Sequence, residues 1–289
     1  MKTKIAVYTS TRADFGILKP LIQQLISAQD FEVRLFVTGT DLEKDFGYTV
    51  AEIEKYFPQN IFYRVQHAMK EDPRLKNLKV MGELVPKYAD ALVENPPQIA
   101  VVLGDRYEAL CFGLVCASLN IPFAHLHGGE LTLGAIDDKF RHCLTKLANW
   151  HFTACETYRE RVIQLGERPE KVFNVGALGV ENALNEKLMS EADLEKDLGI
   201  SFAADKENYL FTFHPETNSA DYGQDLLKNF LQKLSQRIQS HQAQVVMTGV
   251  NSDPGAEKIR RQIQDFQKQH PKNVVFRESL GMLRYLSVM

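Results

Sequence analysis

The sequence predicts an α/β protein built on parallel sheets with helices on both faces. Short apolar segments alternate with amphipathic helical segments along most of the chain, which is the pattern of β/α units. Polar turns containing glycine or charged residues follow several of the apolar segments, as expected where parallel strands end at a ligand-binding edge. The pattern restarts in the last third of the chain, which indicates a second domain.

The first domain is expected over residues 1–176. Its strands are predicted at residues 5–9, 33–37, 61–65, 99–103, 122–126, 151–154 and 172–175. Its helices are predicted at residues 16–27, 78–94, 108–119, 139–149 and 158–165, because apolar residues recur there at three- and four-residue spacing.

The second domain is expected over residues 177–289 and begins with the polar helical connector NEKLMSEADLEKDLGI. Strands are predicted at residues 209–213, 244–248 and 273–276, and helices at residues 221–239 and 255–269. The last residues, LGMLRYLSVM, read as the opening of another helix. Such a series forms only half of a doubly wound sheet, so we expect this domain to be incomplete.

Composition narrows the function classes. The chain has 289 residues, of which 44% are hydrophobic and 25% charged, with a net charge of -3. This is globular composition without the basic field that nucleic-acid binding needs. No apolar run approaches the roughly 18 to 20 residues that span a bilayer, and the N-terminus lacks a signal-peptide core. We therefore expect a cytoplasmic protein without nucleic-acid or membrane partners.

The cysteines and one apolar helix bear on metal binding, disulfides and oligomeric state. Cys111, Cys116, Cys143 and Cys155 form no CxxC pair, so we expect buried free thiols rather than a zinc site or disulfides. The apolar segment CFGLVCASL fits either the core or a dimer face, and we favour the core. Whether the chain forms a homodimer stays open.

Two strand ends in the first half carry charged residues. In TSTRADFG, Arg12 is a candidate phosphate clamp, and the alternative is a surface pair in which Asp14 caps the helix. In VVLGDRYEA, Gly104 precedes Asp105 and Arg106. Asp105 is a candidate acid or base, and the alternative is a cap for the next helix.

The densest group of ionisable residues is HLHGGELTLGAIDDKFRH. His125 and His127 are expected on one face of a strand, where an HxH metal site is possible but disfavoured, because no further ligand has suitable spacing. Glu130, Asp137 and Asp138 follow. Carboxylates gathered in one crevice push one another's proton affinities apart, which suits a site that needs both a base and an acid.

A further candidate lies in the second domain. His214 follows a predicted strand within FTFHPETN and could hydrogen-bond a diphosphate. A structural role for this histidine before a proline is the alternative.

These motifs together resemble, in order and spacing, the hydrolysing UDP-N-acetylglucosamine 2-epimerases. The matching segments are TRADFG, GDRYEA, HLHGGELTLGAID, RHCLTKLANWHF, YRERVIQLGE, VFNVGALG and HPET. The resemblance implies two Rossmann-like domains in the GT-B arrangement, with a UDP-sugar between them. It also implies elimination of UDP to a 2-acetamidoglucal, followed by hydration to N-acetylmannosamine, in sialic-acid-type biosynthesis. No metal or redox cofactor is needed for this reaction.

The resemblance also implies roles for individual residues. The acid–base groups would be Asp105, Glu130 and Asp137, with Asp138 as the alternative to its neighbour. The substrate and UDP contacts would be Arg12, Arg106, His127 and His214.

Three points stay open at this level. The family continues with a segment like GNSSSGIxE beyond the point where this sequence ends, so we expect a truncated chain with weak or no activity alone. UDP-N,N'-diacetylbacillosamine is an alternative substrate. A GT-B glycosyltransferase and a non-catalytic nucleotide-sugar binder are the competing functions.

Overall fold

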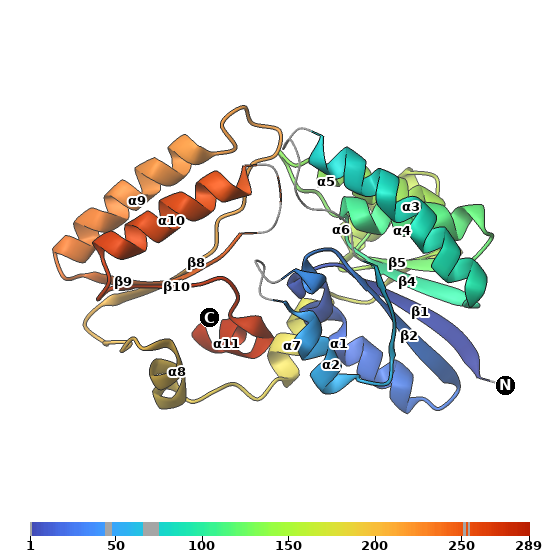
Figure 1. Ribbon diagram of the computed structural model, residues 1–289, viewed down its shortest axis with the longest axis horizontal. Coiled ribbons are helices and arrows are strands. Elements are labelled where there is room, and N and C mark those ends of the chain that lie inside the picture. The colour runs from blue at the N-terminus through green and yellow to red at the C-terminus, as the bar shows by residue number, and fades with distance from the viewer. Residues whose placement is uncertain (1, 44–47, 66–74, 251–252, 254) are drawn as a thin grey trace. The chain divides into compact units, whose positions relative to one another are not determined.

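The computed structural model describes residues 2–43, 48–65, 75–250, 253 and 255–289. They form two compact units, Met1–Leu184 and Asn185–Met289 (Figure 1). The division falls at the last residue of α7 (Leu178–Asn185), later than residue 176, because this helix up to Leu184 belongs to the first unit. Leu178 packs against a core of the first unit, and the Asn182 side chain donates a hydrogen bond to the Gly16 carbonyl at 2.8 Å.

The first unit is built on a seven-stranded, fully parallel sheet in the order β3-β2-β1-β4-β5-β6-β7. Its strands are β1 (Thr3–Thr9), β2 (Phe31–Thr38), β3 (Ile61–Val65), β4 (Ile99–Leu103), β5 (Phe123–Leu126), β6 (Trp150–Thr153) and β7 (Val172–Asn174). Each of the seven predicted strands is present. The order reverses between β1 and β4, and open α/β sheets bind ligands at the carboxyl ends of strands next to such a reversal.

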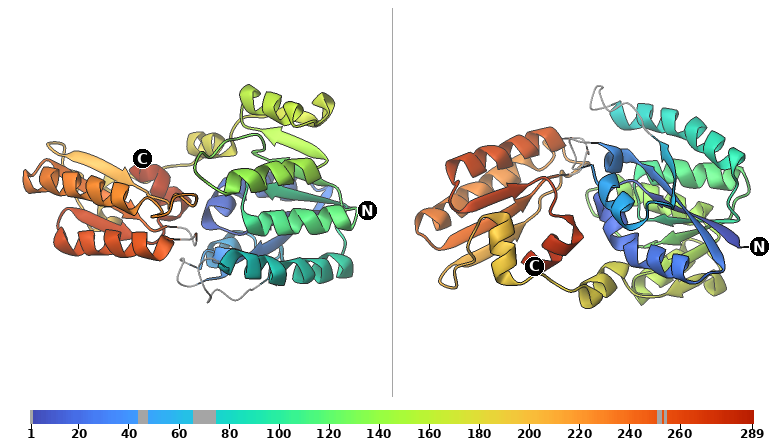
Figure 2. Two further views of the ribbon diagram at one scale, coloured as in Figure 1. Left: turned by 90° about the horizontal axis from the view of Figure 1, so that it is seen from above. Right: turned by 60° about the horizontal axis from the view of Figure 1, so that its bottom comes forward.

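Helices cover both faces of this sheet (Figures 1 and 2). They are α1 (Arg12–Ser27), α2 (Val50–Tyr56), α3 (Lys76–Glu94), α4 (Tyr107–Ser118), α5 (Asp137–Leu147) and α6 (Glu156–Gln164). One core joins α3, α4 and α5 to side chains such as Tyr8 and Phe36, and the other joins α1 and α2 to the alternate positions Val7 and Leu35. This period of two on strands that are buried on both sides is what a doubly wound sheet requires. The predicted α/β class is confirmed.

Several short elements of the first unit were not predicted, among them α7. The 3-10 turn η1 (Gly39–Leu42) and the helix α2 follow β2. Helix α2 has only seven residues and buries Val50 and Ile53, so its apolar pattern is too short to show a helical period. A second 3-10 turn, η3 (Pro169–Lys171), precedes β7.

Helix α4 belongs to the core, as the sequence favoured. Phe112, Val115 and Cys116 are buried. All four cysteines of the chain are free, and Cys111 and Cys116 are buried as expected. The expectation is wrong for Cys143, which is exposed on α5, and Cys155 is half-buried.

The second unit has a parallel sheet in the order β10-β9-β8. Its strands are β8 (Glu207–Phe211), β9 (Ala243–Thr248) and β10 (Val274–Arg277), and its helices are α8 (Glu191–Leu198), α9 (Gln224–Gln239), α10 (Ala256–Gln269) and α11 (Gly281–Val288). One core lies under α9 and α10, and the other lies under α8 and α11. The predicted strands and the final helix are thus present. In the described part of both units, no helix combines the length and apolarity needed to cross a bilayer.

Candidate active site

The turn after β1 is closed by a capping box. Asp14 Oδ2 accepts hydrogen bonds from the Ser10 backbone N–H at 3.2 Å, the Ser10 hydroxyl at 2.8 Å and the Thr11 N–H at 3.0 Å. In return, Thr11 Oγ1 accepts from the Asp14 N–H, so the start of α1 is held in both directions. The capping role considered for Asp14 is therefore confirmed. Arg12 is the first residue of α1, and its side chain lies outside the described part of the chain.

The residue after β4, Gly104, is hydrogen-bonded to β5 through both of its backbone polar groups. Gly104 has a φ of +79°, a conformation that suits glycine. Its N–H donates to the Leu126 carbonyl at 3.1 Å, and its carbonyl lies 2.8 Å from His125 Nε2. Both polar groups of the residue before Asp105 are therefore fixed by the neighbouring strand.

His125 is a neutral structural residue. Because Nε2 faces a carbonyl, which can only accept, it must carry the hydrogen, and Nδ1 then accepts from the Thr145 hydroxyl at 3.2 Å. Complete burial lowers the pKa of His125 to about 3, against the opposing effect of the Gly104 hydrogen bond. The ring therefore joins the end of β4 to α5 without a charge.

His127 does not lie on one strand face with His125, so that expectation is wrong. Strand β5 ends at Leu126, and His127 has a φ of +62°. This conformation breaks the two-residue period. The His127 ring turns to Glu130, with Nδ1 2.7 Å from Oε1, while Nε2 is buried and has no hydrogen-bond partner among the described residues. The described residues contain no group of His, Cys, Asp or Glu side chains arranged to hold a metal ion.

The glycine pair after His127 is required by close packing. A Cβ on Gly128 would lie 3.0 Å from His125 Nδ1, and one on Gly129 would lie 2.3 Å from the Tyr158 carbonyl oxygen. Gly129 also has a φ of +80°, and its carbonyl accepts a hydrogen bond from Arg161 of α6. The loop therefore lies directly against the His125 ring and α6, which fixes the position of Glu130.

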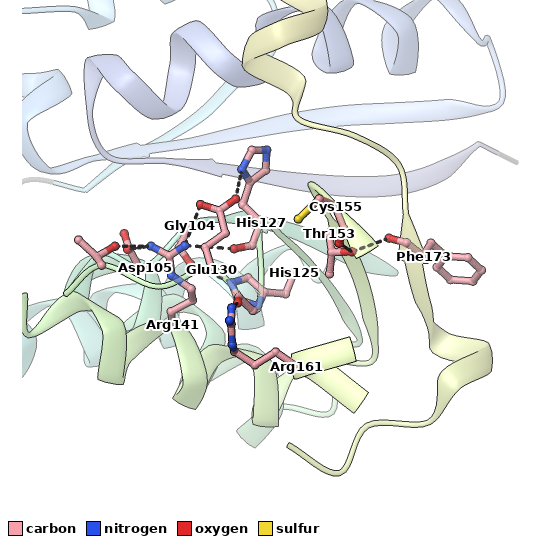
Figure 3. Close-up of polar contacts among 12 residues, drawn as sticks. Gly104, Asp105, His125, His127, Glu130, Arg141, Thr153, Cys155, Arg161 and Phe173 are labelled. Carbon is pink, nitrogen blue, oxygen red and sulfur yellow. Dashed lines mark hydrogen bonds and ion pairs between the residues drawn. The ribbon is translucent and has the colours of Figure 1, made fainter. Parts of the chain in front are cut away.

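Arg141 of α5 brings two of the predicted acid–base residues together (Figure 3). Its Nη1 is 3.0 Å from Glu130 Oε2, and its Nη2 forms an ion pair with Asp105 Oδ2. The guanidinium also donates to Thr132 Oγ1 at 3.2 Å and to the His127 carbonyl at 3.4 Å. Sequence reasoning assigned Arg141 no role, because its partners lie on other segments.

Glu130 is held as a carboxylate. Burial alone would raise the pKa of Glu130, but the hydrogen bond and charge of His127 and the charge of Arg141 outweigh burial and lower it. The side chain of Glu130 is 26% exposed and that of Asp105 is 21% exposed. A ligand at this edge of the sheet could therefore reach both.

The first turn of α5 separates the roles of two neighbouring acids. Asp138 Oδ1 accepts a hydrogen bond from the Thr132 N–H at 3.0 Å, which ties the loop to the helix. Asp137 is the first residue of α5 and is half-buried. Asp138, the alternative acid–base candidate, is therefore bonded to the loop, and the acid–base role of Asp137 stays a prediction.

Arg106 and His214, two further predicted ligand contacts, differ in their surroundings. Arg106 is buried, with Nε 3.4 Å from Oε2 of the fully buried Glu108. Glu108 lies in the first turn of α4 and was assigned no role of its own from the sequence. His214 belongs to the second unit, follows β8 and is exposed.

Comparison with known proteins places the chain in a family. A family model described as UDP-N-acetylglucosamine 2-epimerase matches residues 23–289. A Campylobacter jejuni protein named GDP/UDP-N,N'-diacetylbacillosamine 2-epimerase (hydrolyzing) is 35% identical, over 100% of this chain and 73% of its own length. The Escherichia coli polysialic acid biosynthesis protein P7 is 33% identical, over 98% of this chain and 72% of its own length.

A solved structure shares the fold. The UDP-GlcNAc 2-epimerase of Neisseria meningitidis, crystallised with UDP-GlcNAc, superposes with a TM-score of 0.77 at 16% identity, covering 99% of this chain and 75% of its own. The family model spans both units of the chain, including the segments that carry Asp105, Glu130 and Arg141. The chain therefore belongs to the UDP-N-acetylglucosamine 2-epimerase family.

Proposed function

We propose that the chain is a hydrolysing 2-epimerase of a UDP-activated 2-acetamido sugar. The substrate put forward first is UDP-N-acetylglucosamine, which would give N-acetylmannosamine and UDP for sialic-acid-type biosynthesis. The observation that carries the proposal is the meeting of Asp105 and Glu130 around Arg141 at the carboxyl edge of the sheet. Both carboxylates are partly exposed there, so they can act on a bound ligand.

The proposed reaction has two stages. A carboxylate removes the proton from C2, the electron pair of that bond forms the C1–C2 double bond, and the C1–O bond breaks as UDP leaves. Water then adds to C1 of the 2-acetamidoglucal, and a proton is delivered to C2 on the opposite face. The C2 proton is only weakly acidic beside an acetal carbon, so departure of UDP must share the work.

Proton transfer on both faces of the ring requires more than one acid–base group. Asp105, Glu130 and Asp137 are proposed for these transfers. Glu130 is ionised before substrate binds, as a base must be, because His127 and Arg141 lower its pKa against the effect of burial. Asp137, at the start of α5, is proposed to act with Asp105 when the proton returns.

The remaining predicted residues are proposed as ligand contacts. The buried Nε2 of His127 is proposed to contact the sugar, because it has no partner among the described residues. Arg12, Arg106 and His214 are proposed to contact the diphosphate. For Arg106 this requires the guanidinium to exchange its ion pair with Glu108 for the phosphate oxygens.

A specific observation favours the second substrate, UDP-N,N'-diacetylbacillosamine. The Campylobacter jejuni relative carries that sugar in its name, whereas the name of the Escherichia coli relative refers to polysialic acid. Both sugars present a 2-acetamido group and a UDP at C1, so the same residues would serve either reaction.

The test is incubation with each UDP-sugar in the absence of any acceptor, followed by NMR of the products. The proposal expects UDP together with the free 2-epimeric sugar. A glycosyltransferase would leave the UDP-sugar unconverted without an acceptor, and a non-catalytic binder would give heat on calorimetric titration without products. Either of these outcomes overturns the proposal. Asp105→Asn, Glu130→Gln and Asp137→Asn should each abolish turnover.

A further inference from the structure

Arg141 lies beneath the two carboxylates that it joins. Its side chain is 6% exposed, compared with 21% for Asp105 and 26% for Glu130. The cation is thus on the protein side and the carboxylates are on the solvent side. A ligand would meet the two acids before it could meet the guanidinium.

The guanidinium is suited to hold two acids at a fixed spacing. It is planar, and its two terminal nitrogens diverge in a fixed fork. In this site one terminal nitrogen donates a hydrogen bond to Glu130, on the loop after β5, and the other donates to Asp105, at the end of β4. Two carboxylates brought this close without a cation would repel, and one of them would take up a proton.

We propose that Arg141 is the positioning residue of the acid–base centre, setting the spacing of Asp105 and Glu130 and keeping Glu130 ionised. This inference rests on the proposed function and adds a residue that does not itself touch the reacting atoms. Its consequence is that the charge of Arg141 and its forked shape have separate effects: the charge keeps Glu130 ionised, and the fork sets the spacing of the two acids. A lysine can supply the first but not the second.

The face of α5 that carries Arg141 organises the rest of the centre. Asp137, Arg141 and Thr145 follow at four-residue spacing, which places them on one side of a helix. Thr145 holds His125, and His125 holds the carbonyl of Gly104, directly before Asp105. One helix face therefore fixes both the backbone that precedes Asp105 and the side chain of Asp105.

The surroundings of Glu130 support this role. The titratable and charged groups that face it are His127 from its own loop, Arg141 from α5 and, through Arg141, Asp105 from the end of β4. Arg161 of α6 binds the carbonyl of the preceding Gly129. Because burial raises the pKa of Glu130 and Arg141 is one of the groups that oppose burial, removing Arg141 should raise this pKa.

The test is a carboxyl-carbon NMR titration of the full chain with labelled Glu and Asp, in which Glu130→Gln and Asp105→Asn identify the two signals. In Arg141→Met, the Glu130 pKa should rise by about 1 to 3 on the pH scale, the usual effect of an opposite charge at this distance. In Arg141→Lys it should stay low, because the charge remains. Hydrogen exchange of residues 128–132 should nevertheless increase in both variants, since neither side chain can bridge the two acids.

Arg34→Met is the matched control. Arg34 is a comparably buried arginine on β2 that donates to Glu32 and to the Asn95 carbonyl. Its loss should lower stability and leave the Glu130 titration unchanged. An unchanged Glu130 pKa in Arg141→Met, or wild-type exchange of residues 128–132 in Arg141→Lys, overturns the inference. These readouts need no turnover, so failure of the proposed reaction would be seen separately in the product assay.

Discussion

Replacing Gly129 with alanine would test how tightly the loop before Glu130 is held against α6. The added Cβ would lie 2.3 Å from the Tyr158 carbonyl oxygen and 2.9 Å from Val162 Cγ2. Ordinary contact begins near 3.4 Å, so the loop and α6 must separate by about 1 Å. The substitution also places alanine at a φ of +80°.

The loss of unfolding free energy in Gly129→Ala has two separable parts. A left-handed alanine costs about 1 to 2 kcal/mol, and forced overpacking adds about 1 to 3 kcal/mol. Gly176→Ala carries only the first cost, because Gly176 has a φ of +84° and a Cβ added there would meet nothing within 4 Å. We therefore expect Gly129→Ala to lose about 1 to 3 kcal/mol more unfolding free energy than Gly176→Ala.

The assay is urea denaturation of both variants, combined with measurement of exchange at C2 of the substrate. Displacement of Glu130 by about 1 Å should reduce that exchange by roughly 100-fold, whereas Gly176→Ala serves as the reference for backbone strain alone. Equal stability of the two variants, or full exchange in Gly129→Ala, would refute the idea that the loop is fixed by its contact with α6.

Further predictions concern stability. Burial raises the pKa of Asp41 to about 7, against the opposing effect of hydrogen bonds from Thr49 and Thr9. Between about pH 4 and pH 7 the folded chain therefore keeps a proton on Asp41 that the unfolded chain releases. The free energy of unfolding should accordingly fall as pH rises through this range. In Asp41→Asn, the melting temperature should fall less steeply with pH over this range than in the wild-type chain. An unaltered slope would contradict the assignment of the raised pKa to Asp41. Thr145→Val should cost about 1 to 3 kcal/mol in denaturation by leaving buried His125 Nδ1 without its donor, and a neutral result would count against the assigned tautomer. Gly82→Ala, in helix α3 with open space around it, should gain about 0.5 to 1 kcal/mol, and a loss would show an unrecognised contact.

Regular elements were predictable because their signal is local. Apolar runs followed by amphipathic helices marked all of the strands of both sheets, and the restart of the pattern indicated the second unit. The boundary at Leu184 was less accessible, because it depends on the contact of Asn182 with the Gly16 carbonyl, far away in the sequence.

The candidate site was only partly predictable for the same reason. The end of β4 and the glycine-rich loop after β5 identified Asp105 and Glu130, since strand ends show in the sequence. Arg141 required the folded structure, because its two carboxylate partners lie 36 and 11 residues away. The strand period failed at His127, where the chain leaves β5 with a positive φ that the sequence pattern does not reveal.

The most direct measurement of the central claim is proton NMR of the chain incubated with UDP-N-acetylglucosamine, and in parallel with UDP-N,N'-diacetylbacillosamine, in deuterated water. Elimination and hydration through Asp105, Glu130 and Asp137 predict UDP and a free 2-epimeric sugar that carries deuterium at C2. The deuterium should be absent when Glu130→Gln replaces the wild-type chain. Released sugar that keeps its original C2 proton, or deuterium incorporation that persists undiminished in Glu130→Gln, would contradict this mechanism.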